Sequence, residues 1–325
     1  MQSRDSIADA KAKITSIKAR KEVILAAGAL HTPQILQRSG VGPAALLQKA
    51  NIPVLVDLPG VGSNMQDHPQ VTMMFNYTTA PLPPSNPPAP LPLMANSVAL
   101  LPLSLVSPTN YTALAKSYLS QSSASYLPTS YNANAALKAG YAAQHKLLGS
   151  SLLRNDNAAI EIPFAGNGGY YLLMLTKPLS RGTITLDPSN PYAEPLVDFN
   201  TFGNPTDLRI ATEAFKFGRV LHSTKAVRGT FNPVEVSPGA AVASEEQLEK
   251  AARDTVVATT AHLSGTASLM PRELGGVVDA ELKVYGVRGV RVVDASVMPM
   301  IPGAHLCSTV YAVAEKAADL IKRGK

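Results

Sequence analysis

The sequence predicts a mixed fold, part α/β and part α+β, in which the two ends of the chain form one discontinuous domain around an inserted, sheet-rich domain. Two apolar, strand-like segments of similar texture, residues 23–27 and 289–296, lie near opposite ends of the 325-residue chain, and each precedes a helical pattern. Between them lie further strand-like segments at residues 159–166, 170–178 and 182–188. A chain of this length accommodates two domains.

The first of these units reads as a buried strand, a glycine turn and a helix. The apolar run Val-Ile-Leu-Ala-Ala at residues 23–27 is typical of a buried parallel strand. Gly28 permits a tight turn and a close backbone approach. We expect Thr32 to cap the helix with Pro33 at its first position, and the Ser-Gly pair at residues 39–40 to end it.

The middle of the chain has a different texture. Residues 78–97 are dense in proline and predict a surface loop, ordered or flexible, rather than the interior of an element. Residues 206–223 carry apolar side chains at helical spacing. Another helix is expected over residues 244–253, where Ser244 and Gln247 form the pattern of a capping box.

The last part of the chain returns to the texture of the first unit. The strand-like segment at residues 289–296 contains Asp294 and Ala295 near its end. The helix that follows has an apolar face made of Val310, Val313, Ala314, Ala317, Leu320 and Ile321. We expect Ser308 or Thr309 to cap its start, and the basic residues at its end suit the helix dipole.

The bulk composition excludes several classes of protein. Hydrophobic residues make up 46% of the chain and charged residues 16%, as in ordinary globular proteins. The formal charge is +6, but lysine and arginine form no basic run, so no nucleic-acid partner is expected. The single cysteine, Cys307, excludes an intrachain disulfide. Because no apolar run has membrane-spanning length and no apolar leader opens the chain, we expect a cytoplasmic protein without a membrane partner.

Histidines are the first candidates for acid–base chemistry, but most have an ordinary structural interpretation. His145 and His222 carry no functional signal beyond their residue type. His31 and His68 lie beside glycine-rich turns, where capping or a supporting role behind another side chain is the expected function.

His262 and His305 differ from the other histidines in their surroundings. His262 precedes a stretch of small residues where backbone can pack closely against a planar ligand, and His305 lies on a proline-glycine loop just before the terminal helix. Two histidines on two loops can divide the work, one taking a proton near neutral pH while the other holds the substrate oxygen. The alternative, in which both are packing residues, fits the spacing slightly better.

Other chemical motifs are missing from the sequence. No set of histidine, cysteine and carboxylate residues has the ligand spacing of a metal centre, so no metal is expected. No G-x-S-x-G nucleophile elbow occurs, which argues against a serine hydrolase. The runs GVGSN and GNGG fail to complete G-x-G-x-x-G and lack a flanking strand and helix.

Four sequence blocks stand in a recognisable order along the chain. They are GALHTPQILQRSGVG at residues 28–42, DLPGVGSNMQDHP at 57–69, KPLSRGTITL at 177–186, and the long segment at 262–321. Together they resemble the glucose-methanol-choline (GMC) oxidoreductases, a family of FAD-dependent alcohol oxidases and dehydrogenases. The order and number of the blocks make this resemblance specific.

The resemblance implies a domain organisation. Residues 1–70 would be a remnant of an FAD-binding, Rossmann-like domain, and residues 271–325 would return to that domain. Residues 71–270 would form the substrate-binding domain, built on an antiparallel sheet with helices. The family's N-terminal βαβ unit with G-x-G-x-x-G is not in the sequence, so holding FAD can require a portion from outside this chain.

The resemblance also implies roles for individual residues. His262 falls where the family keeps the base that removes the hydroxyl proton of an alcohol, after which the alcohol carbon delivers hydride to the flavin. His305 falls where a second residue hydrogen-bonds the same oxygen, and Leu263 replaces the family's usual proline. The positions implied to lie against the flavin are Ala27, Gly28, Asp294, Ala295, Thr309 and Val310. The start of the terminal helix would then face the flavin and stabilise its reduced, anionic form.

Three interpretations of the activity stay open at this point. The first is an FAD-dependent oxidoreductase that converts a primary or secondary alcohol to an aldehyde or ketone, in a setting such as fungal-type secondary metabolism. The second is a non-catalytic fragment that cannot hold FAD alone. The third is a relative that acts as a lyase on cyanohydrins. The apolar, proline-rich region at residues 71–250 favours a hydrophobic or aromatic alcohol, and no motif separates oxidase from dehydrogenase.

Overall fold

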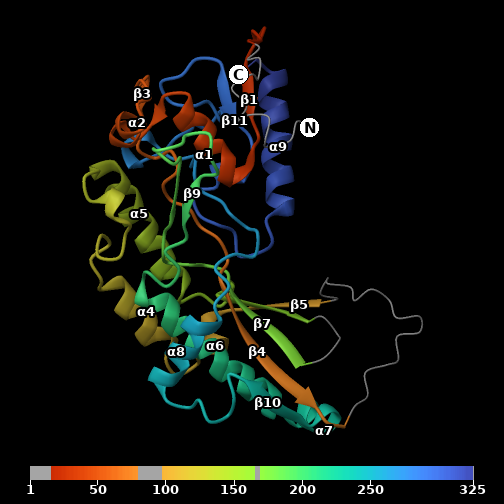
Figure 1. The fold of residues 1–325 in the computed structure, drawn as a ribbon. Helices are drawn as coiled ribbons and strands as arrows, with labels where there is room; N and C mark the ends of the chain where they lie inside the picture. The colour runs from red at the N-terminus through yellow and green to blue at the C-terminus, as the bar shows by residue number, and fades with distance from the viewer. Residues whose placement is uncertain (1–15, 80–96, 165–168, 325) are drawn as a thin grey trace.

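The described residues form two parallel strand pairs, one antiparallel pair and a five-stranded antiparallel sheet, with helices around them (Figure 1). The structure is a computed structural model and describes residues 16–79, 97–164 and 169–324, so most of the loop expected at 78–97 lies outside the described residues. The strands are β1 (Val23–Leu25), β2 (Val41–Gly42), β3 (Val56–Asp57), β4 (Gln70–Tyr77), β5 (Ser97–Leu101), β6 (Ile160–Phe164), β7 (Gly169–Leu175), β8 (Thr183–Thr185), β9 (Leu196–Asp198), β10 (Pro233–Ser237) and β11 (Val290–Val292). The helices are α1 (Gly28–Arg38), α2 (Ala44–Lys49), α3 (Leu103–Val106), α4 (Tyr111–Leu119), α5 (Ala135–Ser151), α6 (Pro205–Ser223), α7 (Lys225–Phe231), α8 (Glu245–Thr255) and α9 (Cys307–Lys322), with 3-10 turns at Thr129–Tyr131, Arg272–Leu274 and Ala295–Val297.

Strands β1 and β11 bring together segments from opposite ends of the chain. They pair in parallel, with Leu25 opposite Val292. Helix α9 runs alongside the pair (Figure 1), and Ala317 on this helix shares an apolar core with Val292. The parallel pairing agrees with the prediction for residues 23–27, but the predicted burial is wrong, because the side chains of Val23 and Ile24 on β1 are exposed. The similar texture of the two end segments in the sequence therefore corresponds to direct strand pairing.

Helix α1 starts earlier than the sequence pattern predicts. It begins at Gly28, whose φ of 75° lets the chain turn straight from β1 into the helix. The predicted cap at Thr32 with Pro33 in the first position is therefore wrong, and Pro33 lies inside the helix. A proline there removes the N–H that would bind the carbonyl of Ala29. The hydroxyl of Thr266 donates to that carbonyl at 2.7 Å and replaces the missing bond.

The buried carboxylate of Asp294 ties the start of α1 to the end of β11. Its Oδ2 accepts the N–H of Gly28 at 2.9 Å and the hydroxyl of Thr32 at 2.5 Å. Its Oδ1 accepts the N–H of Ser296 at 2.8 Å and that residue's hydroxyl. The Thr32 oxygen also accepts the N–H of Ala27, so this threonine bridges the turn instead of capping a helix start. One carboxylate thereby satisfies donors from both ends of the chain.

The side chain of Gln37 connects α1 to the strand pair formed by β8 and β9. Its amide nitrogen donates to the carbonyls of Val61 and Ile184, at 3.3 and 3.1 Å. Its oxygen accepts the N–H of Leu186 at 2.7 Å. A fully buried glutamine with both ends satisfied adds specificity to this junction, since leaving any of these groups unpaired would cost free energy.

The inserted region is built on a five-stranded sheet in the order β10-β4-β7-β6-β5, with each neighbouring pair antiparallel. Helices α3, α4, α6 and α8 cover one face of this sheet (Figure 1). The side chains that the sheet buries on this face include Val71, Met73, Ile160, Ile162 and Leu173. They alternate along the strands with residues of the opposite face, as the period of a β-strand requires.

The opposite face of the sheet is open and largely apolar. Leu100 lies directly opposite Glu161, and Met74 lies opposite Tyr170, so all four point to this side. Leu100 is 49%, Met74 44% and Tyr170 53% exposed. Glu161 alone among the four is buried, at 1% exposure. Met174, which lies opposite Glu161 on β7, is buried as well, at 3% exposure. The buried carboxylate of Glu161 makes this part of the face a candidate site.

The helices predicted in the middle region are present at nearly the predicted residues. The helix expected at 206–223 is α6, which begins one residue earlier at Pro205 with Asn204 as its cap. The capping box of Ser244 and Gln247 at the start of α8 is confirmed.

The predicted cap of α9 is wrong. This helix begins at Cys307, with Leu306 in the preceding position and no side-chain hydrogen bond closing its first turn. Ser308 and Thr309 lie inside the helix instead. Its first turn therefore keeps backbone N–H groups without a capping side chain, a property that favours an anionic or electron-rich neighbour.

The mixed fold class predicted from the sequence is confirmed, whereas the domain boundaries at residues 70 and 270 stay a prediction. Within the described segments, none of the helices combines the length and apolar character needed to cross a bilayer.

Gly62 and Gly229 form a matched pair for testing the packing. Gly62 has a φ of 82°, and a Cβ on it would lie 2.0 Å from the carbonyl oxygen of Ile184. We expect Gly62→Ala to lower the free energy of unfolding by at least about 2 kcal/mol, because it adds both backbone strain and overpacking. Gly229 is exposed within α7 with open space around it, so Gly229→Ala should be neutral or stabilise by up to about 1 kcal/mol. Urea unfolding of both variants checks this, and equal effects would contradict it.

Candidate active site

The loop at residues 60–69, just before β4, holds a second loop in place at the site. The side-chain oxygen of Gln66 accepts the N–H of Ile301 at 3.1 Å, and its nitrogen donates to the carbonyl of Pro299 at 3.1 Å. Asn64 donates to the same carbonyl at 2.9 Å. The segment that carries His305 is thus anchored by two amide side chains from a glycine-rich block of the sequence.

The carboxylate of Asp67 anchors the segment that carries His262. It accepts backbone N–H groups of His68 at 2.7 Å, Thr260 at 3.1 Å and His262 at 3.2 Å, and the hydroxyl of Thr259 at 2.5 Å. Asp67 is 5% exposed, so these bonds compensate for the burial of its charge. Because Asp67 binds the backbone of both His68 and His262, it holds these two residues close to each other.

His68 and His262 contact each other through their rings. Their Nδ1 atoms are 3.0 Å apart and the ring planes are nearly perpendicular, at 81°. The other nitrogen of His68, Nε2, lies 3.1 Å from the carbonyl oxygen of Pro302. The Nδ1 of His262 is also 2.9 Å from the hydroxyl of Thr260. His68 is fully buried and His262 is half-buried, so the pair reaches from the interior to the site surface.

His305 completes a row of three imidazoles and brings in a carboxylate. Its ring centroid is 4.7 Å from that of His262, again edge to face. Its Nε2 lies 2.7 Å from Oε1 of Glu161, the buried carboxylate on the open face of the sheet. The row Glu161, His305, His262 and His68 therefore runs from the antiparallel sheet to the loop at residues 60–69.

The pKa values of the two inner histidines are lowered. Burial and the neighbouring His262 lower the pKa of His68 to about 3, with Lys177 and His305 acting in the same direction. Burial, followed by His305, also lowers the pKa of His262, while Asp67 and Glu161 act against this. Both imidazoles are therefore neutral at pH 7, which is the form that can accept a proton.

The residues predicted to contact a cofactor lie around the carboxyl ends of β1 and β11 and the first turn of α9. They are Ala27, Gly28, Asp294, Ala295, Thr309 and Val310. Ala27 is exposed at the end of its strand, and Ala295 and Val310 pack against one small apolar cluster with Met298, Ile301 and Leu306. The carboxyl ends of parallel strands are the usual place for ligands in α/β folds. The loop bearing His305 connects this region to the histidine row.

Two members of the row, His68 and Glu161, were not predicted as site residues. His68 was given a capping or supporting role, and its contact with His262 spans 194 residues of sequence that no local pattern connects. Glu161 carries a detectable signal, since it is a lone carboxylate within the apolar strand segment Ala-Ile-Glu-Ile-Pro-Phe. A charge on a strand that otherwise reads as buried indicates a paired or functional group.

Two other histidines have structural contacts away from the row. His145 lies 3.0 Å through Nε2 from the carbonyl of Tyr118, and His222 stacks on Phe75 at a centroid distance of 3.6 Å. Their interpretation as packing residues agrees with these contacts. Among the described residues, no group of three or more histidine, cysteine, aspartate or glutamate side chains could hold a metal ion.

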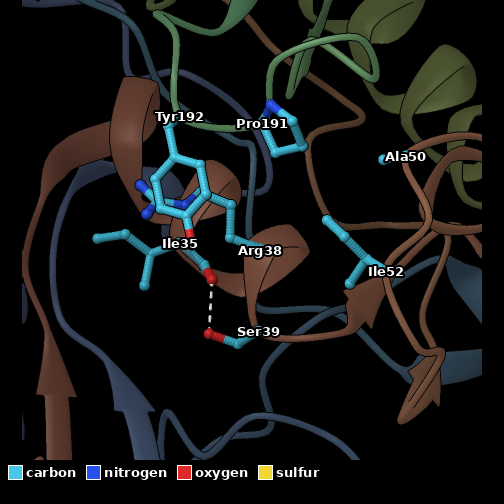
Figure 2. A pocket seen from close by; sticks show the side chains of 7 residues that line it. All are labelled: Ile35, Arg38, Ser39, Ala50, Ile52, Pro191 and Tyr192. Carbon is cyan, nitrogen blue, oxygen red and sulfur yellow. Dashed lines mark hydrogen bonds between the residues drawn. The ribbon is translucent and has the colours of Figure 1, made fainter. Parts of the chain in front are cut away.

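A surface hollow of about 480 Å³ lies elsewhere, beside the end of α1 (Figure 2). In it, the guanidinium of Arg38 lies over the ring of Tyr192, 4.1 Å from the centroid. The hydroxyl of Ser39 donates to the carbonyl of Ile35 at 2.8 Å. None of the described residues that line this hollow is an imidazole or a carboxylate. The histidine row lies outside this hollow.

Comparisons with known proteins identify the family. The model for the C-terminal part of GMC oxidoreductases matches residues 178–314, and the model for their N-terminal part matches residues 6–70. The chain therefore belongs to the GMC oxidoreductase family.

Individual relatives extend over nearly the whole chain. It is 33% identical to the dehydrogenase xptC of Emericella nidulans, over 95% of this chain and 53% of that protein. A solved FAD-dependent oxidoreductase from Chaetomium thermophilum is 32% identical with a TM-score of 0.88, over 95% of this chain and 56% of the other. A solved fungal aryl-alcohol oxidase is 36% identical with a TM-score of 0.88, over 97% and 56%. The chain spans about half the length of the curated relatives it matches.

The lowered pKa of His68 predicts a pH-dependent stability. Between pH 6.5 and about 3 the unfolded chain binds a proton at this residue that the folded chain excludes. The free energy of unfolding should therefore fall as the pH falls, by up to about 1.4 kcal/mol per pH unit from this group. We expect His68→Gln to remove that part of the slope in urea unfolding measured between about pH 6 and pH 4, a range inside this titration window.

His31→Gln is the matched control, because His31 is half-exposed and its ring contacts Gln34 outside the row. It should keep the wild-type slope. An unchanged slope in His68→Gln would contradict the prediction.

Proposed function

We propose that the chain provides the acid–base site and part of the cofactor site of an FAD-dependent oxidoreductase that converts an alcohol to an aldehyde or ketone. The observation that carries this proposal is the edge-to-face pair of His262 and His305, whose ring centroids are 4.7 Å apart. Each ring also contacts a buried side chain: His68 contacts His262, and Glu161 contacts His305. Membership of the GMC oxidoreductase family and likeness to a fungal aryl-alcohol oxidase support an alcohol oxidoreductase in general.

The residues at the carboxyl ends of β1 and β11 fit a cofactor of the flavin type. A Cβ on Gly28 would meet nothing within 4 Å, so the turn leaves room for a ligand beside it. The first turn of α9 has no capping side chain and can face an electron-rich ring edge. In this proposal the cofactor would be held by residues at these strand ends and in the first turn of α9, namely Ala27, Gly28, Asp294, Ala295, Thr309 and Val310. Bound FAD would supply the acceptor for the hydride that leaves the alcohol carbon.

His262 is the proposed base. Its Nδ1 is engaged by His68 and Thr260, and no hydrogen bond from the described residues reaches its Nε2. Nε2 is therefore the atom that accepts the hydroxyl proton of the alcohol. The lowered pKa of His262 keeps its ring neutral before the reaction, so Nε2 can accept the hydroxyl proton.

His305 is proposed to hold the alcohol oxygen while His262 takes the proton. Its Nε2 donates to the carboxylate of Glu161, which fixes the ring and directs Nδ1 away from the sheet contact. Glu161 is anchored in β6 at the middle of the antiparallel sheet, so the ring is supported by a rigid element. The pair thus offers one proton acceptor and one positioned partner for a single oxygen.

The open face of the sheet favours an apolar or aromatic alcohol as substrate. Leu100, Met74 and Tyr170 share this face with Glu161 and are exposed. Such a wall stabilises apolar groups by burying them and offers few hydrogen bonds to the many hydroxyls of a sugar. The aryl-alcohol oxidase among the similar structures fits this substrate class.

His262→Gln tests the assignment of the base. The 325-residue chain is loaded with FAD and mixed anaerobically with a panel of benzylic, aliphatic and sugar alcohols, and bleaching of the flavin is followed. We expect wild-type protein to be reduced fastest by benzylic alcohols, and His262→Gln to be slower by about 10²–10⁴-fold.

His222→Gln, which changes a histidine outside the site, serves as the control and should keep the wild-type rate. Protein that retains no flavin would support the non-catalytic interpretation for the chain alone. Cleavage of a cyanohydrin without flavin reduction would support the lyase interpretation.

The pH dependence of flavin reduction tests the state of the base. Because only neutral His262 accepts the proton, the rate should fall as the pH falls through the pKa of His262, which lies below its usual 6.5. His305→Asn removes the electrostatic interaction with His305 that lowers the pKa of His262, so the acidic limb of the pH profile should move to higher pH. If the acidic limb of the pH profile stays in place or moves to lower pH in His305→Asn, the limb does not report the titration of His262.

A further inference from the structure

The contact between His68 and His262 allows only certain proton positions. Their Nδ1 atoms are 3.0 Å apart, a hydrogen-bond distance, so one nitrogen must carry the proton and the other the lone pair. Two lone pairs facing each other at this distance would repel, and two N–H groups would collide. The partner on the far side of His68 decides between the two permitted arrangements.

That partner is the carbonyl of Pro302, which can only accept a hydrogen bond. The Nε2 of His68 lies 3.1 Å from this oxygen and must therefore carry a proton. His68 is fully buried, so a second proton on the same ring would place a charge in the interior. The low pKa of His68 agrees with a neutral ring. With Nε2 protonated and the ring neutral, Nδ1 of His68 is a lone-pair acceptor.

We propose that His68 is the positioning residue that sets the tautomer of the base, holding the proton of His262 on Nδ1 and leaving the lone pair on Nε2. The order of bonds is Pro302 carbonyl, Nε2–H of His68, Nδ1 of His68, and Nδ1–H of His262. The catalytic meaning of this tautomer rests on the function proposed above, since Nε2 is the nitrogen left free for substrate. The tautomer itself depends only on residues of this chain.

The carboxylate nearest the pair does not take this role. All four hydrogen bonds of Asp67 go to the N–H groups of His68, Thr260 and His262 and to the hydroxyl of Thr259, so none reaches an imidazole ring. A neutral imidazole therefore occupies the place that a carboxylate holds in a Ser-His-Asp triad. A neutral partner orients the base without raising its pKa as strongly as an anion would.

The hydroxyl of Thr260 is the competing partner of the same nitrogen. It lies 2.9 Å from Nδ1 of His262 and could donate to a lone pair there. That arrangement would turn two lone pairs toward each other across the contact between the histidines, so we assign the Thr260 oxygen as a second acceptor of the shared Nδ1–H. Thr260→Val should consequently leave the tautomer of His262 unchanged, whereas a change at His68 should not.

Nitrogen-15 NMR of histidine-labelled protein tests the assignment without flavin or substrate. The ring nitrogens of His262 are assigned by their loss in His262→Gln, and one-bond coupling identifies which nitrogen bears hydrogen. We expect protonated Nδ1 and bare Nε2 in the wild-type chain and in Thr260→Val. We expect His68→Leu to lose this preference and populate the Nε2–H form, and His68→Gln, whose amide offers both a donor and an acceptor, to restore it at least in part.

His145→Gln is the matched control, because it alters another buried histidine bonded to a backbone carbonyl, that of Tyr118. It should leave the His262 signals in place. Wild-type protein with the proton on Nε2 of His262 would overturn the proposal, even if His68→Leu fails to fold. A tautomer that survives His68→Leu, or shifts in Thr260→Val, would overturn it as well.

Flavin reduction in the loaded chain separates this proposal from the function it rests on. Because His68 does not touch substrate, His68→Leu should lower kcat with little change in KM, and His68→Gln should recover part of the loss. A chain that oxidises no alcohol would overturn the proposed function and leave the tautomer assignment standing on the NMR result.

Discussion

The carboxylate of Asp67 is the interaction on which the arrangement of the histidines depends. It gathers the N–H groups of His68 and His262, residues 194 positions apart, onto one buried anion. Ala261, between the bound residues, has a φ of 61°, a conformation that costs roughly 1–2 kcal/mol for a residue with a Cβ. Charge-assisted bonds to one carboxylate can offset this strain. The anion thus fixes the backbone from which the imidazoles of His68 and His262 project.

The two faces of the antiparallel sheet differ in their surroundings. Val71 and Ile160 lie on the face packed against helices, and this face contributes to the larger apolar core. The other face carries the buried carboxylate of Glu161, whose Oε1 lies 2.7 Å from Nε2 of His305. A carboxylate in this position is compensated by a partner from a distant segment, so the sheet holds it without losing the apolar surface around it.

Much of the fold could be predicted from periodicity, whereas the site required contacts between distant segments. Strands β1, β6, β7, β8 and β11, helix α6 and the capping box at Ser244 follow from local patterns. Strands β4, β5 and β10 of the antiparallel sheet were not predicted. The start of α1 could not be predicted, since Thr32 bonds Asp294 across the chain instead of capping. His262 and His305 differ from the other histidines in their loop surroundings, and only the family resemblance implies a role for each. His68 was assigned a lesser role, because its importance arises from a ring contact that no sequence spacing encodes.

The loop at residues 299–305 serves both histidines at once. It carries His305 directly, and through the carbonyl of Pro302 it bears on His262 by way of His68. Gln66 and Asn64 hold the start of this loop by hydrogen bonds to Pro299. A small displacement of this short loop would therefore move His305 and change the hydrogen bonding of His68 and His262 at the same time. A substitution in the loop is consequently expected to affect both histidines together, even where it touches neither ring.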